Sequence, residues 1–126
     1  MNGSSNLKPI NYFENRGSAQ CKSAIIFGGM RTNGTTVIKA KKTRNHTELL
    51  CKYLNLPVKI NNNKNYDLIK VKRVNKINPL NYNIPSDISS SAFFIVLTVL
   101  SSNSELTIKN VNINPSRTGI IEILKR

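Results

Sequence analysis

The sequence is poor in acidic residues, histidine, cysteine and tryptophan. Its 126 residues include six Asp and Glu against 19 Lys and Arg, one His, two Cys and no Trp, which gives a formal charge of +13. This length suits one domain at most and allows a core without disulfide or metal staples. Cys21 and Cys51 form no Cys-x-x-Cys pair, so we expect no zinc or redox site and two reduced, packed cysteines.

Long apolar runs are also lacking. The longest, from Ala92 to Leu100, is broken by Thr98 and is far shorter than the roughly 20 residues of a membrane-spanning helix. We expect it to be a buried core segment. The first residues have neither the basic start nor the apolar stretch of a secretory signal. These absences predict a cytoplasmic protein without a membrane partner.

The positive charge has two interpretations. Charge of this size suits nucleic acid, an anionic membrane or a small anion. Asn, Ile and Lys, however, occur 19, 15 and 13 times, a bias typical of codons rich in A and T, which adds surface lysine without a selected partner. The lysines are scattered along the sequence, and the aromatic residues form no ladder with arginine. We therefore favour codon bias as the origin of the positive charge. The densest basic cluster stays a candidate anion site; its members are Lys39, Lys41, Lys42 and Arg44.

Apolar patterns predict an α/β domain with the order β-α-β-α-β-β. Helices are expected over 18–31 and from His46 to Leu54, and strands over 7–13, 35–39, 58–60 and 68–71. Asn45 and Glu48 are spaced as a capping box for the second helix. Gly28 and Gly29 are expected to permit a close helix contact. A domain boundary is predicted near Pro85.

The pattern then restarts. Residues 23–27 resemble 91–95, and residues 36–39 resemble 106–109, at an offset that grows from 68 to about 74 residues later in the chain. One and a half copies of this unit predict that the chain is a piece of a longer repeat protein.

Candidate ligand groups lie where the two predicted helices begin. A helix N-terminus presents unpaired N–H groups and a partial positive charge, which suit a phosphate or carboxylate. Ser18 and Gln20 add a hydroxyl and an amide at the first helix, and Arg44 adds a bidentate donor at the second. From spacing alone, an ordinary N-cap for Ser18 and a solvated charge for Arg44 are the simpler interpretations. His46 is interpreted as a half-buried packing residue.

Five ordered motifs resemble a known family over nearly all of the chain. They are Ser18-Ala19-Gln20-Cys21-Lys22-Ser23-Ala24, Gly34-Thr35-Thr36-Val37-Ile38, Thr43-Arg44-Asn45-His46-Thr47-Glu48, Pro85-Ser86-Asp87 leading to 89–94, and Asn114-Pro115-Ser116-Arg117-Thr118-Gly119. Together they resemble 5-enolpyruvylshikimate-3-phosphate synthases, the 3-phosphoshikimate 1-carboxyvinyltransferases. Asn45, Ser86 and Ile88 depart from the family's usual Asp, Gly and Pro, which leaves the shape of the crossover open.

The resemblance implies the "inside-out" barrel fold of enolpyruvyl transferases, built from β-α-β-α-β-β units and present here only in part. Residues 1–85 would be the last unit of the inserted domain, and 86–126 the crossover and incomplete start of the other domain. The implied activity moves the carboxyvinyl group of phosphoenolpyruvate to the 5-hydroxyl of shikimate 3-phosphate and releases phosphate, in aromatic amino-acid biosynthesis. The implied enzyme is a monomer without a metal or organic cofactor.

The resemblance also implies a substrate site. Ser18 and Ala19 would hold the shikimate phosphate, Gln20 would contact shikimate 3-phosphate near phosphoenolpyruvate, and Arg44 would pair with the phosphate, with Thr43 a weaker candidate. The family's Lys-Ser phosphate loop and its phosphoenolpyruvate-binding arginines have no counterpart here, and the six acids offer no convincing proton-transfer pair. We therefore assign no catalytic residue and expect the chain alone to be inactive, as a fragment from a truncated gene or as one chain of a split enzyme.

Two alternatives remain open. The related enolpyruvyl transferase of cell-wall synthesis, which acts on a nucleotide sugar, shares the fold, but Ser18-Ala19-Gln20 followed by Lys22 favours the shikimate enzyme. A small basic nucleic-acid-binding module is an alternative of a different class, while the favoured interpretation has no nucleic-acid partner.

Overall fold

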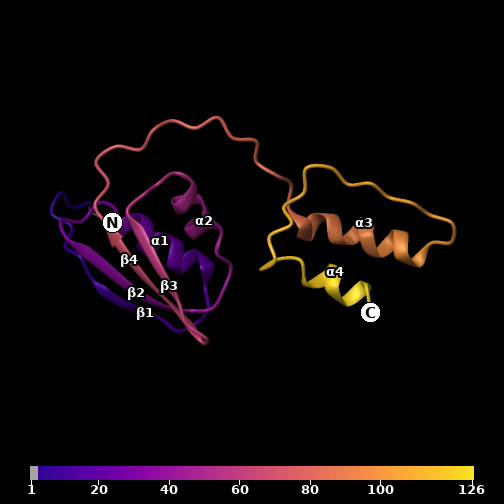
Figure 1. The fold of residues 1–126 in the computed structure, drawn as a ribbon, viewed down its shortest axis with the longest axis horizontal. Helices are drawn as coiled ribbons and strands as arrows, with labels where there is room; N and C mark the ends of the chain where they lie inside the picture. Colours follow the sequence, from indigo (N-terminus) through magenta and orange to yellow (C-terminus); the bar gives the residue numbers. More distant parts are fainter. Residues whose placement is uncertain (1–2) are drawn as a thin grey trace. The chain divides into compact units, whose positions relative to one another are not determined.

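The computed structural model describes residues 3–126 as two compact units, the first ending at Pro79 and the second beginning at Leu80. The first unit contains β1 (Asn11–Glu14), α1 (Ala19–Gly29), β2 (Thr35–Lys41), α2 (His46–Tyr53), β3 (Val58–Asn62) and β4 (Tyr66–Lys72) (Figure 1). The second contains α3 (Ile88–Leu100) and α4 (Gly119–Leu124). The predicted α/β class and the β-α-β-α-β-β order of the first unit are confirmed.

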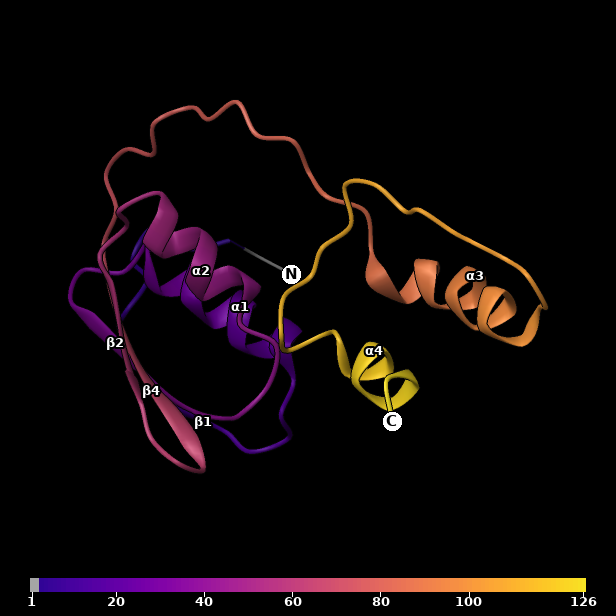
Figure 2. The ribbon, with the colours of Figure 1, turned by 45° about the vertical axis from the view of Figure 1, so that its right-hand side comes forward.

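The four strands form one sheet in the order β1-β2-β4-β3. β1 and β2 are parallel because α1 crosses over between them, whereas β4 runs antiparallel to both of its neighbours. β1 begins later than the predicted strand, since its ladder with β2 runs only from Asn11 to Glu14 and Pro9 has no N–H to extend it. Both helices of this unit cover the same face of the sheet (Figure 2).

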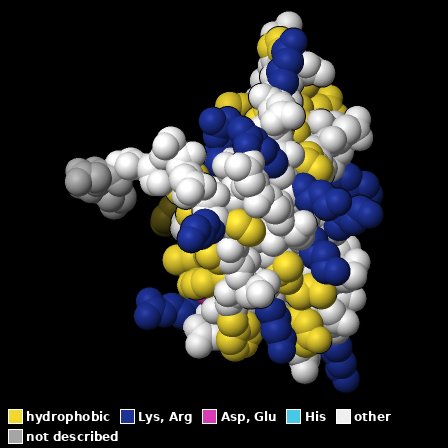
Figure 3. Space-filling view, turned by 90° about the vertical axis from the view of Figure 1, so that its left-hand side faces the viewer, with side chains coloured by type: hydrophobic (Ala, Val, Ile, Leu, Met, Phe, Trp, Pro, Cys, Tyr) yellow, Lys and Arg dark blue, Asp and Glu magenta, His cyan; other side chains and the backbone are white. Residues whose placement is uncertain are grey.

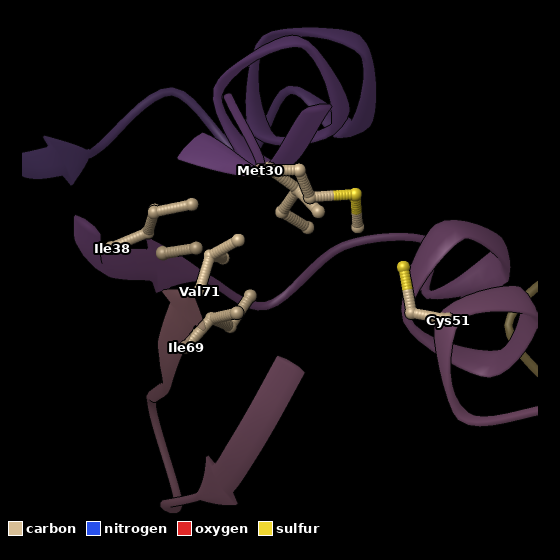
Figure 4. Packing of buried hydrophobic residues seen from close by; sticks show 7 residues of the cluster. Met30, Ile38, Cys51, Ile69 and Val71 are labelled. Carbon is tan, nitrogen blue, oxygen red and sulfur yellow. The ribbon is translucent and has the colours of Figure 1, made fainter. Parts of the chain in front are cut away.

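The core lies between that face and the two helices. Alternate residues of β2 and β4 point into it, as the two-residue period of a strand requires. Its buried members are Ile26, Met30, Ile38, Ala40, Cys51, Ile69 and Val71, most of them labelled in Figure 4. Gly29 makes the close contact that the sequence predicts, because a Cβ there would stand 3.0 Å from the Thr36 Cβ. The prediction of two packed cysteines is correct for Cys51 and wrong for Cys21, which is exposed on α1.

The opposite face of the sheet is open and basic. Five exposed lysines share it through the alternation of the strands: Lys39, Lys41, Lys59, Lys70 and Lys72. The Lys39 Nζ stands 5.3 Å from the ring centre of Phe13 and 4.5 Å from that of Tyr66, which are cation–π distances. Figure 3 shows many Lys and Arg side chains and almost no Asp or Glu on the visible side. Lysines that are scattered in the sequence are thus partly gathered by the fold.

The second unit is open on its apolar side. The prediction that Ala92 to Leu100 is a buried core segment is wrong, since Phe93 and Leu100 are each 79% exposed. Residues 106–109, which resemble 36–39 in sequence, form no strand, and the strand pairing within the second unit is an isolated bridge between Ser86 and Val111. A strand needs a neighbour to pair with its backbone, and within 3–126 none runs beside this segment. No helix in this described range is long and apolar enough to span a bilayer.

Candidate functional site

The starts of α1 and α2 lie side by side and border one hollow. Its volume is about 460 Å³, and its lining comes from both helices and from the segment before α2: Ala19, Gln20, Ser23, Ala24, Phe27, Arg44, His46 and Thr47. The sequence singled out Ala19, Gln20 and Arg44 from two separate motifs. The fold brings these three residues to one place.

A buried carboxylate shapes the turn that leads into α1. Glu14, at the end of β1, is 2% exposed, and its two oxygens accept from the backbone N–H groups of Arg16 at 3.0 Å and Gly17 at 2.8 Å. Gly17 has a φ of +72°, in the left-handed region that glycine enters without steric cost. The turn therefore places Ser18 at the helix start.

Ser18 is the N-cap of α1. Its Oγ accepts from the backbone N–H of Cys21 at 3.2 Å, which is the ordinary capping role. A hydroxyl that accepts in this way still has its O–H to donate. The N–H groups of the first helical turn point out of the helix end at the same place. The capping role and a phosphate-binding role are thus compatible at Ser18.

Gln20 and Arg44 contact each other directly. The Arg44 guanidinium donates to Gln20 Oε1 at 3.3 Å, which joins the first turn of α1 to the segment that precedes α2. Arg44 is half-buried and Gln20 is exposed. The pair therefore presents a cation and an amide at the rim of the hollow, groups that suit a phosphate and an adjacent hydroxyl.

Lys22 and Glu48 form a buried ion pair behind the hollow, and sequence reasoning assigned neither of them to the site. Lys22 is 0% exposed and Glu48 is 4% exposed, and the Lys22 Nζ contacts Glu48 Oε1. The same Nζ donates to the backbone carbonyl of Arg44 at 2.8 Å. The sequence did contain a sign that Lys22 is buried. It lies four residues before Ile26, and therefore on the same face of α1, which the core covers.

The ion pair corrects the capping-box prediction. Asn45 makes no side-chain capping bond to α2, and the Glu48 carboxylate turns to Lys22 instead of reaching back to the helix start. A buried ammonium without a counter-charge costs more free energy than a partly buried helix end without a side-chain cap, so Glu48 pairs with Lys22. Glu48 still lies in the first turn of α2, where a negative charge is favourable.

Hydroxyl groups tie the two helices together beside the hollow. Ser23 Oγ and Thr47 Oγ1 are 2.6 Å apart, and Ser23 Oγ also donates to the Ala19 carbonyl at 2.8 Å. His46 is half-buried, as predicted, and it lies on the lining of the hollow. Residues 3–126 contain no group of three His, Cys, Asp or Glu residues that could hold a metal ion.

Two motifs of the second unit also meet. Asp87 caps α3 through the Ser89 N–H at 3.0 Å and accepts from the Arg117 guanidinium at 2.7 Å. Arg117 donates to Ser89 Oγ as well, at 2.6 Å, and Asn114 Oδ1 accepts from the Ser116 N–H at 2.9 Å. Asp87 is a helix-start group, as predicted.

The comparisons with known proteins agree with one another. A family model described as EPSP synthase (3-phosphoshikimate 1-carboxyvinyltransferase) matches residues 1–126. The 3-phosphoshikimate 1-carboxyvinyltransferase of Staphylococcus aureus strain JH9 is 42% identical over 124 residues, which are 95% of this chain and 28% of that protein. Its counterpart in Caldicellulosiruptor saccharolyticus is 43% identical over 127 residues, or 100% of this chain and 29% of that protein.

A solved structure gives the same result for the fold. The EPSP synthase from Acinetobacter baumannii superposes with a TM-score of 0.79 at 36% identity, over 95% of this chain and 27% of that one. The chain thus spans less than a third of the length of these relatives. With the family model matching from end to end, the chain belongs to the EPSP synthase (3-phosphoshikimate 1-carboxyvinyltransferase) family.

Proposed function

We propose that this chain is part of an enolpyruvyl transferase that acts on phosphoenolpyruvate and shikimate 3-phosphate. The 5-hydroxyl oxygen of shikimate 3-phosphate adds to C2 of phosphoenolpyruvate while C3 gains a proton and the hydroxyl loses its own. The tetrahedral intermediate then loses phosphate from C2 and a proton from C3, which restores the double bond as a carboxyvinyl ether. The observation that carries the proposal is the meeting of Gln20 with Arg44 at the start of α1, where the fold opens a hollow.

The roles follow from the groups on that rim. Ser18, through its O–H, and the N–H groups of the first turn, including that of Ala19, would donate to the phosphate of shikimate 3-phosphate. Arg44 would pair with the same phosphate, with Thr43 as a weaker contributor. Gln20 would contact the substrate with its amide, near phosphoenolpyruvate. All four main groups bind and orient the substrate, and none of them is given a proton-transfer role.

We further propose that residues 1–85 form the last unit of one domain of the whole enzyme and 86–126 the crossover and beginning of the other. The whole enzyme is proposed to be a cytoplasmic monomer. The chain alone is expected to be inactive, because it spans only 28% of the length of the Staphylococcus aureus relative.

A hybrid enzyme tests the proposal. Residues 1–126 replace the matching segment of the Staphylococcus aureus enzyme, to which the chain is 42% identical, and steady-state kinetics are measured for the hybrid with Gln20→Ala or Arg44→Ala. We expect each change to raise KM for shikimate 3-phosphate by about tenfold or more, the equivalent of one charge-assisted hydrogen bond.

The control is Lys59→Met, which removes an exposed charge on β3 and should leave both kinetic constants unchanged. Full activity of both site variants would overturn the assignment of the site. A hybrid that cannot form the carboxyvinyl product would overturn the proposed function itself.

A further inference from the structure

The buried ion pair of Lys22 and Glu48 links the two segments that form the proposed site. Lys22 follows Gln20 by two positions on α1, and Glu48 lies on α2, four positions after Arg44, which precedes that helix. The Lys22 Nζ makes two contacts, with Glu48 Oε1 and with the Arg44 carbonyl. One ammonium group therefore joins α1 directly to the backbone that carries Arg44, whereas the Ser23–Thr47 contact joins α1 to α2.

Lys22 cannot be a ligand itself. Its side chain is 0% exposed, and its charge is balanced by Glu48, so the cation available to an anion in the hollow is that of Arg44. The hydrogen bond of Lys22 to the Arg44 carbonyl is its contact with a rim residue, so its effect on the substrate is expected through the position of Arg44.

Stability alone gives a weak reason for this pair. Replacing a buried ion pair by apolar residues of similar volume is often neutral or stabilising, because both ions lose their hydration when they are buried. Here the pair is also incompletely satisfied, since Glu48 Oε2 has no hydrogen-bond donor among residues 3–126. An apolar pair beside Ile26 would serve the core at least as well, but it could not donate to the Arg44 carbonyl.

We propose that Lys22, held by Glu48, is a positioning residue that fixes Arg44, and through the Arg44–Gln20 contact also Gln20, in the geometry that receives shikimate 3-phosphate. This inference rests on the proposed function for its substrate. Lys22 holds the Arg44 backbone, the Arg44 guanidinium holds Gln20 Oε1, and the two side chains are presented together at the rim.

The test uses a double variant that removes the hydrogen bond from Lys22 to the Arg44 carbonyl without leaving an unpaired buried charge. Lys22→Met combined with Glu48→Leu deletes both ions, so the fold should survive, whereas the hydrogen bond to the Arg44 carbonyl is lost. Lys22→Arg keeps the charge and a donor and serves as the conservative rescue. Lys59→Met is again the matched lysine control.

Two readouts separate positioning from stability. In the 126-residue chain without substrate, nuclear Overhauser contacts between the side chains of Gln20 and Arg44 report their geometry, and a denaturant midpoint reports folding. In the hybrid enzyme, KM for shikimate 3-phosphate and kcat are measured. We expect the double variant to unfold near the wild-type midpoint, to lose the Gln20–Arg44 contacts, and to show a KM raised about tenfold or more with a smaller change in kcat.

Each outcome bears on one proposal or the other. Wild-type Gln20–Arg44 contacts together with a wild-type KM in the double variant would overturn the positioning role. A folded Lys22→Arg variant that lacks these contacts and has a raised KM would overturn it as well. Loss of the contacts with an unchanged KM would support the positioning of Arg44 and overturn the proposed substrate site. Full activity of Gln20→Ala and Arg44→Ala would overturn the site independently of Lys22.

Discussion

Buried charges shape the residues around the candidate site. Glu14, Lys22 and Glu48 are 2%, 0% and 4% exposed. Glu14 holds the turn before α1, and the other two join α1 to α2. Apolar periodicity could not reveal these roles. A charged residue on an apolar face only interrupts the pattern, and its role becomes visible when the structure shows its partner. Asn45 and Glu48 match a capping box in spacing, yet the structure uses Glu48 elsewhere.

The carboxylate of Asp87 gives a pH prediction at this scale. The backbone N–H of Ser89, and then the Arg117 guanidinium, hold the pKa of Asp87 below its ordinary value of 3.8. A lowered folded-state pKa means that the carboxylate stabilises the folded unit at pH above 3.8, and that this contribution is lost as the pH falls through the folded-state pKa. Asp87→Asn should therefore weaken the dependence of stability on pH in that acidic range.

We expect Arg117→Gln to raise the pKa of Asp87 toward its ordinary value, because one of its two main donors is lost. The measurement is a carbon-13 titration of the Asp87 carboxyl group, with Arg16→Gln, a change of an exposed arginine in the first unit, as the control. An identical titration midpoint in Arg117→Gln and the unsubstituted chain would contradict the ion pair.

The local sequence pattern predicts the helices and strands of the first unit. How closely these elements pack against one another depends on single residue contacts. α1 packs close to β2 and β4 because Gly29 faces Thr36 and Val71, whose Cβ atoms lie 3.0 and 3.3 Å from where its own Cβ would be. Gly28, its neighbour in the same helix, has nothing within 4 Å of that position. The Gly-Gly pair in the sequence could not show which glycine makes the contact, since that depends on the rotation of the helix against the sheet.

This pair predicts opposite effects on stability. Gly29→Ala should lower the free energy of unfolding by about 1–3 kcal/mol, because the two strands in its way belong to the core and cannot move without cost. Gly28→Ala should raise it by about 0.5–1 kcal/mol, because alanine loses less backbone entropy than glycine in a helix. Urea unfolding of the two variants and the unsubstituted chain checks both signs. Equal stabilities of the two variants would show that α1 does not approach the sheet this closely.

At the scale of the whole chain, the two units differ in how far their apolar residues are covered. The first unit buries its core under α1 and α2, while the second exposes Phe93, Leu97 and Leu100 of α3. The apolar run from Ala92 to Leu100 predicted burial, because such a run is the usual sign of a core segment. The run alone carries no information about whether covering segments are present, and the chain spans only 28% of the Staphylococcus aureus relative.

The open basic face of the sheet gives a prediction for the whole chain. Its five lysines lie on the solvent side of strands, where codon drift adds lysine without disturbing the core, and Lys59 and Lys70 stand directly opposite each other. We therefore expect weak binding of single-stranded or duplex DNA at low salt, and none at physiological salt. Fluorescence anisotropy at two salt concentrations measures this, with a log–log slope of about −0.9 per duplex phosphate contacted. Tight binding at physiological salt would favour the nucleic-acid-binding alternative.

The sequence by itself determined the order of the elements in the first unit, the starts of both site helices and the family, because strand and helix periods, turn residues and short motifs are local features. The assignment of Ser18, Ala19, Gln20 and Arg44 to a substrate stays a prediction that the proximity of Gln20 and Arg44 supports. Only the tertiary structure decided that Glu48 pairs with Lys22, that five lysines share one face, that Cys21 is exposed and that α3 is left uncovered. Burial and ion pairing depend on which distant segments the fold brings together, and no local pattern contains that information.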